Sequence, residues 1–209
     1  MRWIIRTLAV LSVVSWIVVA GLFARPIVSS ETPAPRMRET PVTAKSLPLD
    51  WSRRVLAGSP GVFPGSSPQQ TESVVPIVDR YARRFHLDPL MVLAVIQVES
   101  RFDPAAVSAQ GAIGLMQLQG PTARDLALDL GLEWTGDDLL FDPDLNVLLG
   151  CAYLRRLMDR FGDQDAALAA YCSGPTLVES RRDANGRIPL AYSDRVWDVL
   201  TSLQGKVSA

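Results

Sequence analysis

The sequence contains few of the residue types on which metal and nucleophile chemistry usually depend. Its 209 residues include one histidine, His86, and two cysteines, Cys151 and Cys172. A site that needs two imidazoles is therefore excluded, and the two cysteines lie too far apart for a zinc knuckle. We expect neither a metal nor a cofactor.

An excess of charge of one sign is also missing. The chain has 21 Lys and Arg against 22 Asp and Glu, which leaves a net charge of -1. Domains that bind nucleic acid usually carry a clear basic excess. The charge balance therefore argues against a nucleic acid partner.

A long uncharged run lies near the N-terminus of the chain. Residues 7–24 contain no charged side chain, and Arg2 and Arg6 precede them. Such a run is typical of a secretory signal peptide or of an N-terminal membrane anchor. Basic residues before the run keep the N-terminus in the cytoplasm and direct the rest of the chain outward. We expect residues 1–24 to have one of these two roles, and both stay open.

Residues 25–71 are rich in proline and poor in large apolar residues. Eight of the fifteen prolines of the chain fall in this stretch. A segment of this composition buries too little surface to offset the entropy of ordering it. We expect a flexible linker. The alternative is that residues 47–56, which include Trp51, dock on a partner or on the domain.

Residues 72–205 show helical periodicity and no alternating strand pattern, which predicts an all-α domain. Asp88-Pro89 and Asp142-Pro143 each place an N-cap aspartate before a proline at the first helical position. Helices are expected from these points to about residue 100 and to Gly162. Further helices are expected over residues 74–85, 121–130, 164–171 and 191–203.

The helix after Asp88 is apolar on nearly every face and ends in one carboxylate, Glu99. A helix of this kind is buried, and burial favours the protonated form of a carboxyl group. A neutral carboxylic acid is what general acid catalysis at a glycosidic bond requires. The alternative is a helix-end glutamate that points into water.

The segment after Glu99 mixes glycines and a few polar side chains with apolar residues, as ligand clefts do. Its residues resemble the signature of the soluble lytic transglycosylase family at Glu99, Ser100, Phe102, Pro104, Ala106, Ser108, Gly111, Ala112, Gly114, Leu115, Met116 and Gln117. The resemblance continues, in the family's order, at Thr122, Ala123, Asp142, Pro143, Asn146, Gly150, Tyr153, Leu154, Phe161, Gly162, Ala170, Tyr171, Gly174 and Pro175. The match covers about residues 74–200. The chain resembles a small, single-domain member of the family.

This resemblance implies a lysozyme-like fold (the SLT domain) and a lyase that acts on peptidoglycan. Glu99 would be the sole acid and base, and the cleaved strand would end in a 1,6-anhydro sugar. The family's pattern assigns the glycan cleft to Ser100, Ser108, Met116, Gln117 and Tyr171. Tyr171 would orient Glu99 or the sugar, whereas Met116 could instead pack in the core and Ser100 could cap a helix turn. The nearest other carboxylates, Asp103 and Asp125, do not belong to the matched polar set.

The chain departs from the family's pattern near its C-terminal end. Cys172 replaces an asparagine, and the family's later Glu-Thr and Tyr-Val pairs are not kept. Tyr192 is the residue that could supply the missing aromatic contact. In a helical hairpin that turns at Gly162, Cys151 and Cys172 would lie at about the same level. An oxidising compartment would then allow a disulfide, although two helix axes about 8–10 Å apart are wide for one.

The resemblance predicts a periplasmic protein that is exported or anchored to the inner membrane. Peptidoglycan glycan strands would be its partner, and a secretion or conjugation machine could be a second. Two other functions stay open. One is a muramidase that hydrolyses the same bond with water, and the other is a non-catalytic glycan-binding scaffold.

Overall fold

The computed structural model describes residues 47–48, 50–57, 63–183 and 187–208. The predicted signal or anchor at residues 1–24 lies outside these residues, as does most of the predicted linker. Among the described helices, none is long and apolar enough to cross a membrane.

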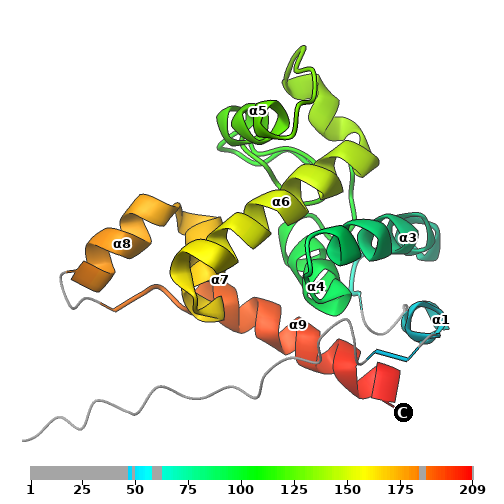
Figure 1. Cartoon of the computed structure of the whole chain (residues 1–209). Helices are drawn as coiled ribbons and strands as arrows, with labels where there is room; N and C mark the ends of the chain where they lie inside the picture. The colour runs from blue at the N-terminus through cyan, green and yellow to red at the C-terminus, as the bar shows by residue number, and fades with distance from the viewer. Residues whose placement is uncertain (1–46, 49, 58–62, 184–186, 209) are drawn as a thin grey trace, which may run out of the picture. The chain divides into compact units, whose positions relative to one another are not determined.

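Over the described residues the chain is all-α, as predicted (Figure 1). The helices are α1 (Trp51–Ala57), α3 (Pro68–Arg84), α4 (Pro89–Glu99), α5 (Gly120–Asp129), the 3-10 helix η2 (Asp137–Phe141), α6 (Pro143–Phe161), α7 (Gln164–Ser173), α8 (Pro175–Asp183) and α9 (Ala191–Ser208). Strand-like pairing in the described part occurs as isolated bridges in the loop between α4 and α5.

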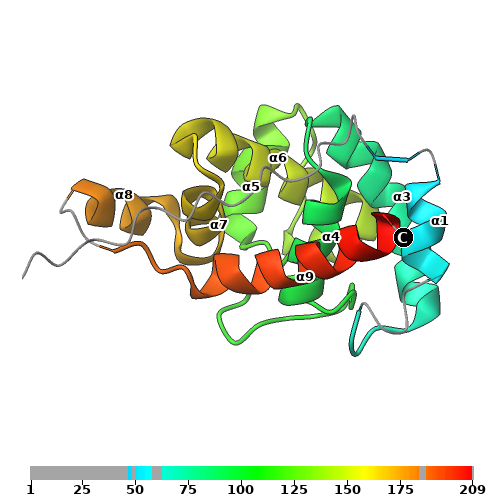
Figure 2. The ribbon, with the colours of Figure 1, turned by 90° about the horizontal axis from the view of Figure 1, so that it is seen from below.

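The most deeply buried helix of the described domain is α4. All of its residues from position 89 to position 97 are buried, because α9 and α3 both pack against it. Figure 2 shows α9 running beside α4. An apolar helix therefore lies inside the domain and carries Glu99 at its C-terminal end.

The helix boundaries predicted from local signals are confirmed. The side chains of Asp88 and Asp142 accept hydrogen bonds from the backbone N–H groups two residues later, as N-caps do. Gly162 ends α6 with a φ of 64°, a left-handed conformation that glycine adopts without strain. α6 and α7 then form the expected helical hairpin.

The prediction of a flexible linker over residues 25–71 is wrong for the part that the structure describes. In α1, Trp51 is 2% exposed and Val55 is fully buried, and the helix packs on α9 and α3. The Arg54 guanidinium also donates to the carbonyl of Val207 at 3.0 Å. The domain therefore begins before residue 72, and the docking alternative for residues 47–56 holds.

α3 begins at Pro68 and not at residue 74, where the sequence predicts its start. Ser67 caps the helix at its N-terminus, and its side chain and that of Gln70 each accept a hydrogen bond from the other's backbone N–H. This arrangement is a capping box, which satisfies two helix N-terminal donors at once. The segment before it is held by Phe63, whose ring contacts that of Phe102 at a centroid distance of 4.6 Å.

Two further elements, η2 and α8, were not predicted. α8 is held against α6 by a two-point ion pair in which the Arg160 guanidinium donates to both oxygens of Glu179, at 2.7 and 2.8 Å. The residues of α8 are mostly polar, so its sequence shows no apolar periodicity that would predict a helix. Its position depends on this contact and on its packing against α7.

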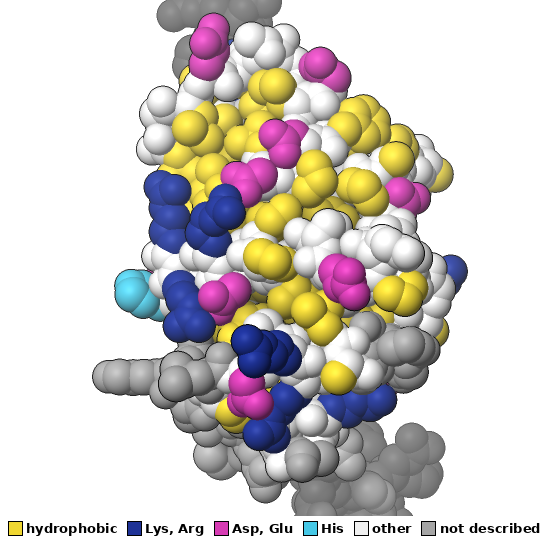
Figure 3. All heavy atoms as spheres, turned by 90° about the vertical axis from the view of Figure 1, so that its right-hand side faces the viewer, with side chains coloured by type: hydrophobic (Ala, Val, Ile, Leu, Met, Phe, Trp, Pro, Cys, Tyr) yellow, Lys and Arg dark blue, Asp and Glu magenta, His cyan; other side chains and the backbone are white. Residues whose placement is uncertain are grey.

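The surface carries charges of both signs next to one another. On the face in Figure 3, Lys and Arg side chains alternate with Asp and Glu side chains. On α3, for example, Arg80 pairs with Asp144 and Arg83 with Asp79. Exposed pairs of this kind contribute about 0–1 kcal/mol each, so the fold depends mainly on its apolar core.

The N-cap of α4 makes the stability of the domain depend on pH. One oxygen of Asp88 accepts a hydrogen bond from Leu90, whereas the other is buried without a partner. Burial raises the pKa of Asp88 from 3.8 to about 6. Because the folded state binds the proton more tightly than the unfolded state, this carboxyl group destabilises the fold increasingly as pH rises from about 4 to about 6.

We expect Asp88→Asn to stabilise the domain at neutral pH, because asparagine keeps the cap and removes the buried charge. The free energy of unfolding should rise by roughly 1–3 kcal/mol at pH 7.5, and this gain should vanish near pH 4. Urea denaturation at the two pH values measures it. An equal difference at both pH values would contradict the assignment to the Asp88 carboxyl.

Candidate active site

The carboxyl group of Glu99 lies where the buried helix α4 reaches the surface. Glu99 is partly buried, and the Tyr192 hydroxyl donates a hydrogen bond to its Oε1 at 2.6 Å. Burial raises the pKa of Glu99 above its ordinary value, while the Tyr192 hydrogen bond and the positive charge of Arg195 oppose that rise. The group is thereby placed to hold a proton and to release it.

Three tyrosines, Tyr153, Tyr171 and Tyr192, form a row beside Glu99, which we call the tyrosine row. The centroids of Tyr153 and Tyr171 lie 5.3 Å apart, and Tyr171 stacks on Tyr192 at 6.5 Å with 14° between the ring planes. Burial raises the pKa of Tyr171 and Tyr192 well above the ordinary value of 10.0. Their hydroxyls therefore stay protonated and act as hydrogen-bond donors at neutral pH.

One buried side chain of α6 holds the loop that follows Glu99. Asn146 accepts a hydrogen bond from the backbone N–H of Met116 at 2.8 Å and donates to the carbonyls of Ile113 and Leu140, both at 2.9 Å. Gly114 allows this approach, because a Cβ there would lie 2.3 Å from the Asn146 amide nitrogen. We call residues 106–118 the cleft loop.

Two other helices fix the same loop. The Ser100 hydroxyl, just after α4, donates to the carbonyl of Leu115 at 2.8 Å. From α7, the Tyr171 hydroxyl donates to the carbonyl of Met116 at 2.8 Å. Because α4, α6 and α7 all bind its backbone, the cleft loop keeps a defined position relative to Glu99.

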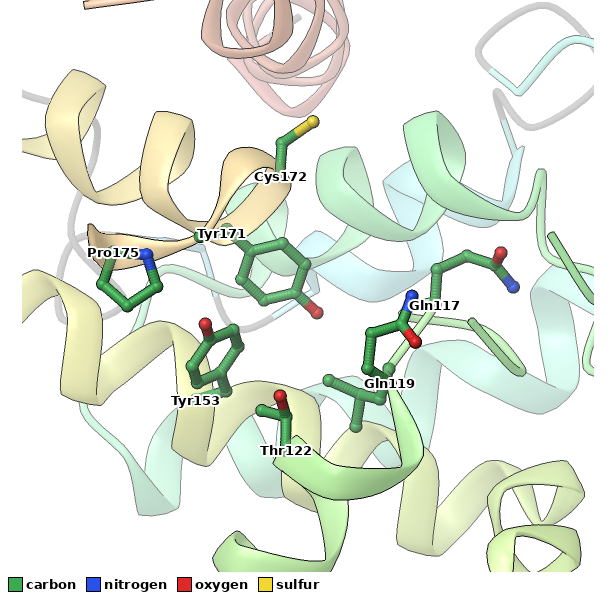
Figure 4. Close-up of a pocket in the computed structure, with 9 residues that line it drawn as sticks. Gln117, Gln119, Thr122, Tyr153, Tyr171, Cys172 and Pro175 are labelled. Atoms are coloured by element: carbon green, nitrogen blue, oxygen red, sulfur yellow. The ribbon is translucent and has the colours of Figure 1, made fainter. Parts of the chain in front are cut away.

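A cavity of about 220 Å³ opens beside the tyrosine row (Figure 4). It is lined by Gln117, Leu118, Gln119, Thr122, Tyr153, Tyr171, Cys172, Gly174 and Pro175. The lining combines two aromatic rings with amide and hydroxyl groups. Aromatic faces with a few polar groups suit a ligand that is part apolar and part polar, such as a sugar ring.

Comparison with known proteins agrees with this geometry. The family profile described as "Transglycosylase SLT domain" matches residues 76–188, which is more than half of the chain. The chain belongs to the transglycosylase SLT domain family. The sequence-based assignment to the lytic transglycosylases is thereby confirmed.

Individual relatives share parts of the SLT domain. A protein named "Transglycosylase" from Enterobacteria phage PRD1 is 41% identical over 91 residues, which cover 44% of this chain and 31% of the relative. A "Membrane-bound lytic murein transglycosylase C" from Histophilus somni is 32% identical over 149 residues, or 64% of this chain and 41% of the relative. The chain thus spans less than half the length of either relative.

Solved structures share the fold. An inactive mutant of the lytic transglycosylase Slt from Pseudomonas aeruginosa is 26% identical with a TM-score of 0.50, over 69% of this chain and 22% of that one. The soluble lytic transglycosylase of Escherichia coli is 23% identical with a TM-score of 0.50, over 75% of this chain and 26% of that one. The described helices therefore form the lysozyme-like SLT fold.

The structure brings only some of the predicted site residues to the cavity. Gln117, Tyr171 and Cys172 line it. Gln117 has a positive φ of 48°, and its amide nitrogen donates to the carbonyls of Ala106 and Gly114, so that its backbone and side chain are both held in the SLT cleft loop.

The other predicted residues make contacts within the SLT domain. Ser108 is partly buried, and its hydroxyl accepts hydrogen bonds from the backbone of Ala112 at 3.0 Å and of Gln110 at 3.3 Å. Met116 is fully buried against Gly150, which leaves no space for a Cβ. The hydroxyl of Ser100, as described above, binds the cleft loop. A glycan contact for these three residues stays a prediction.

The two cysteines of the SLT domain are not bonded in the structure. Cys151 is fully buried in α6, whereas Cys172 is exposed at the cavity, and both are free thiols. The predicted disulfide is therefore absent from the structure, because the α6 cysteine faces the core and the α7 cysteine faces the cleft. Burial raises the pKa of Cys151, which keeps that thiol protonated.

Two residues are more important to the site than the sequence analysis indicated. Tyr192, expected only as an aromatic contact, is the hydrogen-bond partner of Glu99. Asn146, expected only as one of the positions that match the family's pattern, organises the cleft loop. A signal existed for Asn146, since it is a polar residue in an otherwise apolar stripe of α6. Among the described residues, no cluster of His, Cys, Asp and Glu could hold a metal ion.

We expect Asn146→Ala to destabilise the SLT domain, because the N–H of Met116 and the carbonyls of Ile113 and Leu140 would lose their partner. The free energy of unfolding should fall by about 2–4 kcal/mol in urea denaturation. Asn146→Asp is the matched variant: it keeps an acceptor for Met116 and loses both donors. A value for Asn146→Ala within about 0.5 kcal/mol of the wild type would disprove the role of this residue.

We expect Tyr192→Phe to raise the pKa of Glu99, because the lost hydrogen bond stabilises the charged carboxylate. Titration of the glutamate carboxyl carbons by NMR measures the change. Tyr153→Phe is the control, since it removes a hydroxyl from the same tyrosine row without touching Glu99. The interpretation fails if both variants leave the titration of Glu99 unchanged, or if both shift it equally.

Proposed function

We propose that the chain is a peptidoglycan lytic transglycosylase that cleaves the β-1,4 bond between N-acetylmuramoyl and N-acetylglucosaminyl residues. The observation that carries the proposal is the Glu99 carboxyl, whose pKa is raised and which is oriented by Tyr192 beside a cavity lined by tyrosines. The names of the relatives, both transglycosylases, support it.

A single carboxylate favours a transglycosylase over a hydrolase. Hydrolysis of a glycoside normally uses two carboxyl groups about 5–9.5 Å apart. In the described part of the chain, the side chains that act on the Glu99 carboxyl are Tyr192 and Arg195, which supports a reaction that uses one carboxylate. Asp103 instead caps the backbone of Ala105, and Asp125 is exposed on α5.

In the proposed reaction, protonated Glu99 donates its proton to the glycosidic oxygen, and the bond from that oxygen to the anomeric carbon breaks. The Glu99 carboxylate then takes the proton of the C6 hydroxyl of the same muramoyl sugar. The freed oxygen forms a bond to the anomeric carbon, which gives a 1,6-anhydro end. The step is intramolecular, so the reacting groups have a high effective concentration and no positioned water is needed.

Tyr192 and the cleft loop have supporting roles in this mechanism. The 2.6 Å hydrogen bond holds one oxygen of Glu99 and stabilises the carboxylate after the first proton transfer. Tyr171 and Gln117 are the predicted glycan contacts that the cavity contains. The mechanism uses neither a metal ion nor a cofactor.

We further propose that the enzyme works on the periplasmic side of the inner membrane. The uncharged run at residues 7–24 and the membrane-bound relative support this location. Service to a secretion or conjugation machine stays a prediction from the sequence.

The test is digestion of purified peptidoglycan sacculi by the full chain and by its Glu99→Gln variant, with mass spectrometry of the released muropeptides. We expect anhydro ends from the wild type and a loss of at least about 10²–10⁴-fold in rate for Glu99→Gln. Reducing ends, one water heavier, would instead identify a muramidase. No release by either protein, with binding to sacculi intact, would identify a glycan-binding scaffold.

A further inference from the structure

The tyrosine row ends in a positive charge. Arg195 lies on α9 one turn after Tyr192, and its guanidinium lies over the Tyr192 ring at 5.6 Å from the centroid. The side chain is exposed. Tyr192 therefore makes three contacts at the site. Its ring stacks on that of Tyr171 and lies under the Arg195 guanidinium, and its hydroxyl donates to Glu99.

Arg195 differs from many arginines of the domain in having no acidic partner among the described residues. Six others form ion pairs with a carboxylate: Arg54, Arg80, Arg83, Arg155, Arg156 and Arg160. Among the described residues, the guanidinium of Arg195 contacts the ring of Tyr192. Within the part of the chain that the structure describes, its five N–H donors are therefore free to bind another group.

This charge lies beside the candidate acid, because the ring that the guanidinium covers belongs to the tyrosine that binds Glu99. The charge of Arg195 acts on both Glu99 and Cys172. Cys172 lines the cavity, and in Figure 4 its thiol points away from Tyr171 and toward α9. An exposed cation beside the proposed catalytic acid would be within reach of a bound strand.

We propose that Arg195 is a specificity-determining residue that binds a carboxylate of the muramoyl unit next to the scissile bond. The inference rests on the proposed function and extends it from the glycan to its charged substituents. The N-acetylglucosaminyl unit offers only neutral hydroxyl and acetamido groups. The muramoyl unit carries a carboxylate, either on its lactyl ether or on the peptide stem attached there. A planar guanidinium matches a carboxylate through two parallel hydrogen bonds, which makes arginine selective for it.

The test measures binding rather than turnover, in a Glu99→Gln background of the full chain. This background leaves the ligands uncleaved and removes any effect of Arg195 on the ionisation of Glu99. Three tetrasaccharides are compared by calorimetry: chitotetraose, which is neutral, a muropeptide tetrasaccharide with its stems, and the same tetrasaccharide stripped by an amidase, which exposes the lactyl carboxylate.

Arg84→Ala is the matched control variant. Arg84 is also exposed and lies over an aromatic ring, that of Phe85, at 5.5 Å. It precedes the N-terminus of α4, whereas Glu99 ends that helix about 16 Å away. Loss of this arginine should therefore affect no ligand.

We expect Arg195→Ala to weaken binding of a charged tetrasaccharide by about 5–20-fold and to leave chitotetraose unchanged. A loss confined to the ligand with stems assigns the contact to a stem carboxylate, and one confined to the stripped ligand assigns it to the lactyl carboxylate. Arg195→Lys should recover part of the loss because it keeps the charge.

Equal weakening for chitotetraose, or no weakening for any ligand that the Glu99→Gln protein binds, would overturn the assignment of Arg195. Failure of the proposed function has a different result. In that case the wild type releases no anhydro ends from sacculi, whether or not the Glu99→Gln protein binds the three ligands and whatever Arg195→Ala does to that binding.

Discussion

The site depends on the three hydrogen bonds of Asn146. A loop with few side chains of its own to bury cannot hold a defined backbone next to a catalytic group unless its polar groups are satisfied. Asn146 binds two residues of the cleft loop and one of η2, and it does so from within the long helix α6. The position of the loop is thereby tied to the most extensive packing surface of the domain.

The glycines near Asn146 follow from the same constraint. Gly114 has a φ of 81° and lies against the Asn146 amide, so a side chain there would collide with Asn146. Gly150 lies against Met116, so a side chain there would collide with the cleft loop. Ser100 and Tyr171 then add hydrogen bonds from α4 and α7. Removing one of these contacts would leave a buried polar group unpaired, which costs about 1–3 kcal/mol each time.

Features determined by neighbouring residues could be predicted from the sequence. The N-caps Asp88 and Asp142, the helix end at Gly162 and the buried character of α4 are of this kind, and all occur in the structure. The capping box at Ser67 was equally local and could have corrected the start of α3. The apolar helix pointed to Glu99 as a candidate and left the solvent-exposed alternative open, and the resemblance to the family's signature assigned its role.

Features that depend on distant residues could not be predicted in this way. Tyr192 meets Glu99 across 93 positions of the chain, and Arg54 meets Val207 across 153. The composition around Trp51 indicates disorder when considered alone, and only the surface offered by α9 and α3 makes burial favourable there. The pairing of the cysteines failed for a similar reason, since the level of a residue along a hairpin does not say which way its side chain faces.

In the proposed mechanism Glu99 is protonated in the first step and charged in the second, and these two states are stabilised by opposite surroundings. As an acid it must hold a proton near neutral pH, and burial at the end of α4 supplies this by raising its pKa. As a base it must then be stable as a carboxylate, and the Tyr192 hydrogen bond and the Arg195 charge supply that. If a substrate carboxylate binds Arg195, it neutralises the charge that lowers the pKa of Glu99, and the strand also displaces water from the cleft. Both changes favour the protonated acid, so a correctly substituted strand would itself help to prepare Glu99 for the first proton transfer.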